Sequence, residues 1–450
     1  MVSKPGQDQT RAAGKSRVLL AALAVFVISL ACSSITRFSG LQAPVPTPEA
    51  PLGLIAYVGN DGNIYTTGRG GKQPNAITQD ANLDPASGQV GRIYQYPTWA
   101  PDGQRLAYVR FSVSESGPEV SLFSALSDGK KAVQAFTSQN FQPFYLSWSP
   151  DSRSIAYLGN DASGVLSQYL VASSGGESKL IGSGQPYYWD WSPDSHTLIV
   201  HSGGARSANP DALLAFITPA GSTSRQELDL KPGSFDAPAW SPKGDAVALA
   251  TQTDAGNEDL VLAGQDGKVK QVLARLSGPA AFAWSPKGVD LAYAVVDRAG
   301  SVPSIRLVVM DSTQPDHQQQ VTEGELAAFF WSPDGGKIAY FLVGTEAPSA
   351  TSFQQVSQTQ PGTDLVVWVY DRASGETKDV ATFVPTASFQ QILPFYSQYQ
   401  RSGTIWSPDS QSLVLSGVDP SGKNAIYTVG ADGSQFQKIA DGDLAFWSWK

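Results

Sequence analysis

The chain has 450 residues, of which 41% are hydrophobic and 16% charged, and its formal net charge at pH 7 is -9. This apolar content is enough for a large core and excludes a wholly disordered chain. The net negative charge, with no Lys/Arg block after the first 17 residues, argues against a nucleic-acid-binding protein, which needs a basic surface.

Residues 1–31 have the features of an export signal. Basic residues precede the uncharged apolar run 18–31, which is shorter than the about 20 residues that a membrane-spanning helix needs. The run leads into the sequence Ile-Ser-Leu-Ala-Cys, which ends at Cys32 and resembles the lipobox of bacterial lipoproteins. The resemblance implies cleavage before Cys32 and acylation of its thiol, which would anchor the protein in the bacterial cell envelope, outside the cytoplasm. An ordinary cleaved signal peptide is the alternative.

Cys32 is the single cysteine of the chain, so the residues beyond it need neither a disulfide nor a thiolate metal site. The segment 32–51 has several prolines at alternate positions, a pattern typical of an extended, semi-rigid polyproline segment. We therefore interpret 32–51 as a tether that carries the lipidated cysteine, and 52–450 as a single folded domain.

One motif recurs along residues 52–450 at spacings of roughly 40 to 50 residues, with one longer interval. It reads Trp-Ala-Pro-Asp-Gly in its first copy and begins with Trp-Ser-Pro in the others. A short apolar strand, for example Ile-Ala-Tyr at 155–157, follows the motif. The tryptophans of the motif are Trp99, Trp148, Trp191, Trp240, Trp284, Trp331 and Trp406. This self-similarity indicates a repeat architecture.

Ser-Pro-Asp-Gly has the residue preferences of a type I turn followed by a left-handed residue, which closes a hairpin between two strands. Proline fixes φ at the second position, and glycine accepts a positive φ at the last one. Ser152, Ser195 and Ser410 replace that glycine in three copies. We expect these serines to be left-handed, each with strain on the order of 1 kcal/mol.

Two further strands follow each hairpin, so each repeat supplies the four short antiparallel strands of one β-propeller blade. No apolar stripe of helical period appears after the signal, and the predicted fold is all-β. The folded part opens with a strand at 54–57 that lacks a preceding Trp strand, and it ends with a Trp strand around Trp447. Paired side by side, these strands would close the ring and remove its free sheet edges. We predict eight blades, with seven as the alternative.

The Trp-Ser-Pro-Asp-Gly and Ile-Ala-Tyr pattern resembles the repeat of TolB-type, WD-like β-propellers, and it is similar to the propeller domains of prolyl-oligopeptidase relatives. The resemblance covers roughly residues 52–450 and implies the architecture. It implies no function, because the matching residues form turns and packing contacts. A proline-rich tether stands where TolB has an α/β domain, and the Gly-x-Ser-x-Gly motif of the peptidase relatives is missing from the sequence.

No motif for catalysis, for a cofactor or for a metal is found in the sequence. The three histidines (His196, His201 and His317) lack metal-binding spacing, and we interpret them as turn or surface groups. The loops 60–63 and 257–259 have the oxygen ligands that Ca²⁺ prefers, but Asn, Asp and Gly are also the residues that tight turns require. We therefore predict no catalytic residue, no cofactor and no metal site.

The two faces of the predicted disc differ, because both long insertions, 344–362 and 383–401, fall on the same face. Insertions on one face of a repeat array commonly mark the binding face. Aromatic and acidic side chains gather in the links between blades on this face, as is typical of recognition surfaces. For each of these side chains, a packing role in the core is the alternative interpretation. The candidate binding residues are Tyr94, Tyr96, Phe144, Tyr145, Tyr187, Tyr188, Trp189, Asp190, Phe235, Asp236, Phe395, Tyr396 and Tyr399.

Two functions are consistent with these observations. The first is a non-catalytic, monomeric binding or scaffold protein that takes a protein, peptide or glycan through the insertion-bearing face and meets the membrane only through its lipid anchor. The alternative is an extracellular hydrolase or lyase that acts on polysaccharide or peptide at the channel mouth, with Asp190 and Asp236 as its acids. Two carboxylates flanking a sugar bond are the chemistry of such an enzyme, but the sequence offers no pair at a diagnostic spacing.

Overall fold

The computed structural model describes residues 53–450 except 87, 162, 204–211, 235, 298–303 and 345–363. The chain divides into the units Met1–Glu49 and Ala50–Lys450, and all described residues belong to the second unit. The predicted signal 1–31, the lipidated Cys32 and the tether 32–51 therefore lie outside the described residues.

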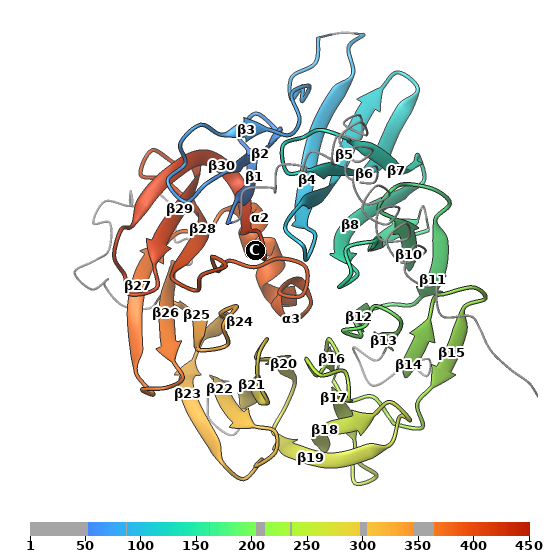
Figure 1. Ribbon diagram of the computed structural model, residues 1–450, viewed down its shortest axis with the longest axis vertical. Coiled ribbons are helices and arrows are strands. Elements are labelled where there is room, and N and C mark those ends of the chain that lie inside the picture. Colours follow the sequence, from blue (N-terminus) through green and yellow to red (C-terminus); the bar gives the residue numbers. More distant parts are fainter. Residues whose placement is uncertain are drawn as a thin grey trace, which may run out of the picture. The chain divides into compact units, whose positions relative to one another are not determined.

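The second unit is an all-β propeller, as predicted, with its sheets arranged in a ring (Figure 1). Six of the sheets have four antiparallel strands each. The first three of these are β4 (Gly91–Trp99), β5 (Arg105–Ser114), β6 (Gly117–Leu126) and β7 (Val133–Ser138); β8 (Phe141–Trp148), β9 (Ser154–Asp161), β10 (Leu166–Ala172) and β11 (Lys179–Ser183); and β12 (Tyr187–Trp191), β13 (Leu198–Ser202), β14 (Leu213–Thr218) and β15 (Ser224–Glu227).

The next three sheets continue the ring in chain order. They are β16 (Ala239–Trp240), β17 (Ala246–Gln252), β18 (Glu258–Gly264) and β19 (Val269–Leu276); β20 (Ala280–Trp284), β21 (Asp290–Asp297), β22 (Ser304–Asp311) and β23 (Gln318–Gly324); and β24 (Leu326–Trp331), β25 (Lys337–Val343), β26 (Leu365–Asp371) and β27 (Thr377–Phe383). In each of them the strand that ends in the motif tryptophan is an edge strand of the sheet.

The seventh sheet joins the two ends of the described chain. Its six strands, in spatial order, are β28 (Ser412–Val418), β29 (Asn424–Gly430), β30 (Gln437–Trp447), β1 (Ile55–Gly59), β2 (Ile64–Thr67) and β3 (Asn75–Ala76). The first part of β30 pairs with β29, for example Ala440 opposite Ile426, and its last part pairs with β1, with Trp447 opposite Ile55. The predicted pairing of the N- and C-terminal strands is thus confirmed.

The fold is a seven-bladed propeller, which was the alternative prediction, and the expected eight blades are not supported. The reason lies in β30, which continues without a break from the repeat that begins at Trp406 into the repeat that contains β1. Two repeats that a count of motifs treats as separate therefore share one strand and form one hydrogen-bonded sheet.

The motif turns explain why the hairpins form where they do. The turn residue Gly103 has a φ of 73°, and the predicted left-handed serines are confirmed, with φ values of 61° at Ser152, 65° at Ser195 and 58° at Ser410. In the second copy the turn closes through a 2.8 Å hydrogen bond from the Ser152 amide to the Ser149 carbonyl. These local bonds fix the hairpin before any contact with another blade is needed.

The left-handed serines also link neighbouring turns, which glycine could not do. The Ser152 hydroxyl accepts a hydrogen bond from the Asp102 amide at 3.1 Å, and the Ser195 hydroxyl accepts one from the Asp151 amide at 3.0 Å. The Ser410 hydroxyl does the same for the turn of another sheet. A hydrogen bond of this kind contributes about 1 kcal/mol, which offsets the strain of a left-handed serine.

Motif tryptophans form a second set of links around the ring. Five of the indole Nε1–H groups donate to a backbone carbonyl on the inner strand of the preceding repeat. In each case the accepting residue is the one just before the tryptophan of that preceding repeat. The pairs are Trp99 with Phe446, Trp148 with Thr98, Trp284 with Ala239, Trp331 with Ala283 and Trp406 with Phe330, at 3.0–3.2 Å. The indole nitrogens of Trp191, Trp240 and Trp447 are buried without a hydrogen-bond partner.

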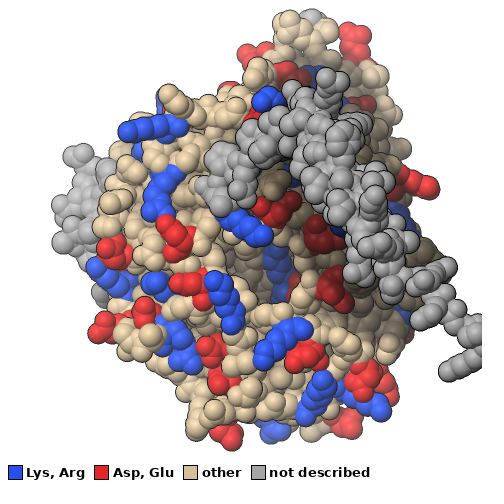
Figure 2. Space-filling view, viewed as in Figure 1, with Lys and Arg blue, Asp and Glu red and all other residues tan. Residues whose placement is uncertain are grey.

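Charged side chains of both signs are interspersed over the face of the ring that Figure 2 shows. Several form exposed ion pairs, such as Arg69 with Asp409 at 2.6 Å, which contribute about 0–1 kcal/mol each. In the part of the chain that the structure describes, no helix is both long enough and apolar enough to span a membrane.

Candidate functional site

The insertion 383–401 is helical and lies at the centre of the ring in Figure 1. It forms α2 (Ala387–Ile392), η1 (Leu393–Phe395) and α3 (Tyr396–Tyr399), and the Thr386 hydroxyl caps α2 by accepting a hydrogen bond from the Phe389 amide. Helix α2 contacts β30, and α3 contacts β12, β20 and β24. The other predicted insertion, 344–362, lies outside the described residues except for Gly344.

Gln398 of α3 anchors the insertion to two blades. Its side-chain oxygen accepts a hydrogen bond from the Trp189 amide at 3.1 Å, and its side-chain nitrogen donates to the Trp189 carbonyl at 2.9 Å. The Tyr145 hydroxyl donates to the Gln398 carbonyl at 2.9 Å and accepts from the Gln398 side chain at 2.9 Å. Because Gln398 is only 3% exposed, its replacement by an apolar side chain would leave buried polar groups unpaired.

An ion pair holds the end of the insertion. Arg401 Nη1 lies 2.5 Å from Asp190 Oδ2, and both side chains are largely buried. Asp190 Oδ2 also accepts a 2.8 Å hydrogen bond from the Trp240 amide. Burial raises the pKa of Asp190, and the Arg401 charge opposes that rise. Asp190 thus serves as the counter-charge of Arg401 beneath the insertion and is already engaged by two partners.

A cavity of about 730 Å³ lies between the insertion and the inner strands β4, β8 and β12. Such a volume is in the range of small-molecule sites, which are lined mainly by apolar and aromatic groups with a few polar atoms. Seven of the predicted binding residues line it: Tyr96, Phe144, Tyr145, Tyr187, Tyr188, Phe395 and Tyr399. Ser388 and Gln391 of α2 and Asp443 of β30 supply polar groups from the other side. We call this space the mouth cavity.

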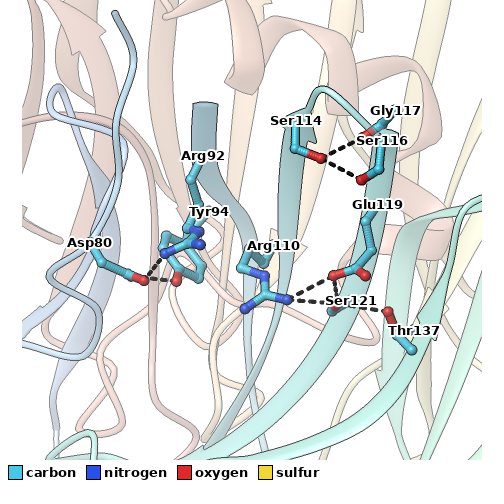
Figure 3. Close-up of polar contacts among 10 residues, drawn as sticks. All are labelled: Asp80, Arg92, Tyr94, Arg110, Ser114, Ser116, Gly117, Glu119, Ser121 and Thr137. Atoms are coloured by element: carbon cyan, nitrogen blue, oxygen red, sulfur yellow. Dashed lines mark hydrogen bonds and ion pairs between the residues drawn. The ribbon is translucent and has the colours of Figure 1, made fainter. Parts of the chain in front are cut away.

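Tyr94 is a predicted binding residue that does not line the mouth cavity. Its hydroxyl donates to Asp80 Oδ1 at 2.5 Å, and Arg92 pairs with the same carboxylate (Figure 3). Burial and this hydrogen bond raise the pKa of Tyr94. Tyr94 and Tyr96 face different sides of the sheet for a local reason. The pairing of β4 with β5 shifts register between Gln95 and Thr98, where Tyr96 has a φ of 58°.

The remaining predicted residues lie at other places. Trp189 of β12 is buried and binds Gln398 of the insertion through its backbone, and Phe235 is outside the described residues. Tyr396 and Asp236 line a second cavity of about 300 Å³, which also contains Tyr188. The acids Asp190 and Asp236 therefore have different surroundings, one in an ion pair and the other at a cavity wall.

Asp236 is 6% exposed and only half satisfied. Its Oδ1 accepts a 2.7 Å hydrogen bond from the Ala237 amide, whereas Oδ2 is buried without a hydrogen-bond partner. Burial raises the pKa of Asp236 from 3.8 to about 7, against smaller opposing effects of the Ala237 amide, the Ser397 hydroxyl and the Arg401 charge. A carboxyl with this pKa exchanges its proton near neutral pH.

Metal binding has no evident place in the described part of the chain, where no group of three or more His, Cys, Asp or Glu side chains is arranged to hold an ion. His201 Nδ1–H donates a 2.9 Å hydrogen bond to the Asp236 carbonyl, and burial lowers the pKa of His201 to about 4. It is a buried strand residue, not the turn or surface group that we expected.

Sequence reasoning missed the residues that hold the insertion in the ring. Gln398, Thr386 and Ser388 were not selected, and Arg401 appeared only as the end of a range. The signal was faint, because helices of four to six residues are too short to show an apolar period. A Thr at 386 followed by several residues with good helix propensity was the available clue.

Comparison with known proteins finds likenesses in structure but none in sequence families. No protein-family model and no curated protein matches the chain. Similar solved structures include TolB from Acinetobacter baumannii (14% identity, 80% of this chain and 82% of that one, TM-score 0.38). Another is the β-propeller domain of the Trilobed protease from Pyrococcus furiosus (13% identity, 78% of this chain and 99% of that one, TM-score 0.48). A third is an oligogalacturonate lyase from Vibrio parahaemolyticus (14% identity, 84% of this chain and 97% of that one, TM-score 0.46). These likenesses carry no information about what this chain binds.

Proposed function

We propose that the protein is a non-catalytic binding protein, held outside the cytoplasm by a lipid on Cys32, which takes its ligand in the mouth cavity. The observation that carries the proposal is the cavity itself, about 730 Å³ in volume, with aromatic walls from three blades and a helical side. Clefts and cavities of this size that are mainly apolar and have a few polar groups are the usual form of ligand sites.

The buried contacts of the insertion also support binding over catalysis. Asp190, one of the two acids considered for an enzyme, is paired with Arg401 at 2.5 Å and does not line the mouth cavity. Most of the side chains that line the mouth cavity carry phenol, phenyl or amide groups. Such groups stack on a ligand and hydrogen-bond to it, whereas covalent or acid–base chemistry needs a group with a suitable pKa within reach.

Ligand capture through the cavity is tested with the full chain, purified in detergent, as bait for an extract of the native cell envelope. Phe395 is 48% exposed at the cavity edge, and Phe395→Ala should reduce the amount of captured material several-fold. The matched control is Leu83→Ala, at a side chain that is 54% exposed and away from the cavity. Equal capture by the wild type and Phe395→Ala would contradict the proposed site.

The anchor is tested separately, at Cys32. Cys32→Ser removes the thiol that the proposed acylation requires, so the variant should lose incorporation of a labelled fatty acid and leave the membrane fraction. Unchanged labelling and unchanged membrane association would contradict the anchor, while leaving the cavity proposal intact.

A second function is favoured by one observation, the raised pKa of Asp236 in the second cavity. A carboxyl that is protonated near neutral pH is a suitable general acid for a hydrolase or lyase acting on polysaccharide or peptide. Turnover of polysaccharides or peptides by the wild type that Asp236→Asn abolishes would favour the enzyme. Absence of turnover in both, together with ligand capture, favours the binding protein.

A further inference from the structure

The charged groups of the mouth cavity are of one sign. Among its described lining residues there is one carboxylate, Asp443, and no Lys, Arg or His. Arg401, whose charge acts on the lining residue Tyr145, is paired with Asp190 at 2.5 Å. The formal net charge of -9 adds a long-range field of the same sign.

Neutral groups hold Asp443 in place. Its Oδ2 accepts a hydrogen bond from the Ser388 hydroxyl, and its Oδ1 accepts one from the Asn424 side chain at 2.9 Å. Neither donor carries a charge, and none of the ion pairs among the described residues includes Asp443. The two hydrogen bonds orient the carboxylate, and no ion pair within the described part of the chain offsets its charge.

Aromatic side chains form much of the rest of the lining. Tyr96, Phe144, Tyr188 and Tyr399 come from the inner strands β4, β8 and β12 and from α3. Burial raises the pKa of Tyr96, Tyr188 and Tyr399, so these phenols stay uncharged. The faces of neutral aromatic rings are electron-rich and attract cations, and protein sites use this attraction to recognise quaternary ammonium ligands.

We propose that the mouth cavity selects a ligand that carries a positively charged amine, primary to quaternary, next to an apolar body. The ammonium group lies between Asp443 and the aromatic wall, and the apolar body fills the remaining volume. A polyanion, such as an acidic polysaccharide, meets the carboxylate with no cation to offset it. This assignment rests on the proposed function, because it names the chemistry of the ligand at the same site.

Three probes of nearly equal shape and different charge test the assignment: choline, 3,3-dimethylbutan-1-ol and 3,3-dimethylbutanoate. Their affinities for the full chain in detergent are measured by ligand-observed NMR titration. Choline should bind about tenfold or more tightly than the neutral alcohol, and the anion should bind more weakly than either. Asp443→Asn should lower choline affinity about tenfold and leave the alcohol unchanged, since asparagine keeps an oxygen for one of the two donors.

Two variants serve as controls. Asp441 lies on the same strand, is exposed and pairs with Lys438 at 2.6 Å, so Asp441→Asn should not change choline affinity. Phe144→Leu keeps an apolar side chain but removes a ring, so it should narrow the difference between choline and the alcohol.

The outcomes separate the two proposals. Equal binding of choline and the alcohol, or an unchanged choline affinity in Asp443→Asn, would overturn the charge assignment and leave a neutral-ligand site standing. Tighter binding of the anion would overturn it as well. If none of the probes binds, the charge assignment fails, and the capture experiment with Phe395→Ala then decides the proposed function on its own.

Discussion

Replacement of the half-satisfied Asp236 by asparagine should stabilise the protein at neutral pH and above. Burial raises the pKa of this carboxyl from 3.8 to about 7. Since each pKa unit corresponds to about 1.4 kcal/mol, ionisation of Asp236 in the folded state costs about 4 kcal/mol. Asparagine cannot ionise, but its amide N–H would face the position where Oδ2 now has no hydrogen-bond partner, which offsets about 1–2 kcal/mol of the gain. The net stabilisation at pH 8 is therefore about 2–3 kcal/mol.

The sign of the pH dependence follows from the raised pKa. Below about pH 4 the carboxyl of Asp236 is protonated in the folded and unfolded states alike, so its pKa shift has no effect on stability. Between about pH 4 and 7 the unfolded chain loses this proton first, and the wild type loses stability as the pH rises. Asp236→Asn lacks this term, so its advantage over the wild type should grow through that window and be constant above it.

The matched control is the same substitution at the other buried acid. Asp190→Asn leaves Arg401 largely buried without its counter-charge, which should destabilise the protein by about 3–5 kcal/mol at pH 8. Free energies of unfolding from urea titrations at pH 4 and pH 8 give both comparisons. If Asp236→Asn is no more stable than the wild type at pH 8, or if the difference does not change with pH, burial of Asp236 does not carry the expected energetic cost.

Three other perturbations test the links around the ring and the insertion. Ser152→Ala loses the inter-turn hydrogen bond and keeps a left-handed side chain, so it should be about 1 kcal/mol less stable than Ser152→Gly in urea titrations; equal stability would contradict the strain argument. Gln398→Ala should speed proteolytic cleavage within 383–401, while Gln390→Ala, at an exposed position of α2, should not. Deletion of Asp443–Lys450 removes the part of β30 that pairs with β1 and should abolish cooperative unfolding in calorimetry; a sharp transition would show that closure is dispensable.

The propeller could be predicted from the sequence because its information is local. A Ser-Pro-Asp-Gly turn and the strands beside it specify a hairpin within about ten residues, and their recurrence specifies the ring. The number of sheets is not local. Asp441-Gly442 has the composition of a tight turn, yet β30 runs through it as a strand because its neighbours β29 and β1 pair with it on either side of this point.

The residues of the candidate site could be predicted only in part, for a similar reason. Inner strands of successive blades begin on the same face, so aromatic residues such as Phe144 and Tyr188, which stand at or near those starts, converge on one cavity. Tyr94 leaves this pattern because a register shift at Tyr96 turns its side chain toward Asp80. The role of Gln398 depends on contacts with residues more than 200 positions away, which no single-sequence pattern reveals.

The shared strand β30 has a consequence for biosynthesis. The Leu54 amide donates a hydrogen bond to the Ser448 hydroxyl across a separation of 394 residues. The edge of β1 that pairs with β30 likewise has no hydrogen-bond partner until β30 has been made. A polypeptide made from its N-terminus therefore keeps an unsatisfied strand at one end until translation has passed residue 447. Closure of the ring is therefore a late step, which follows the synthesis of the last strand.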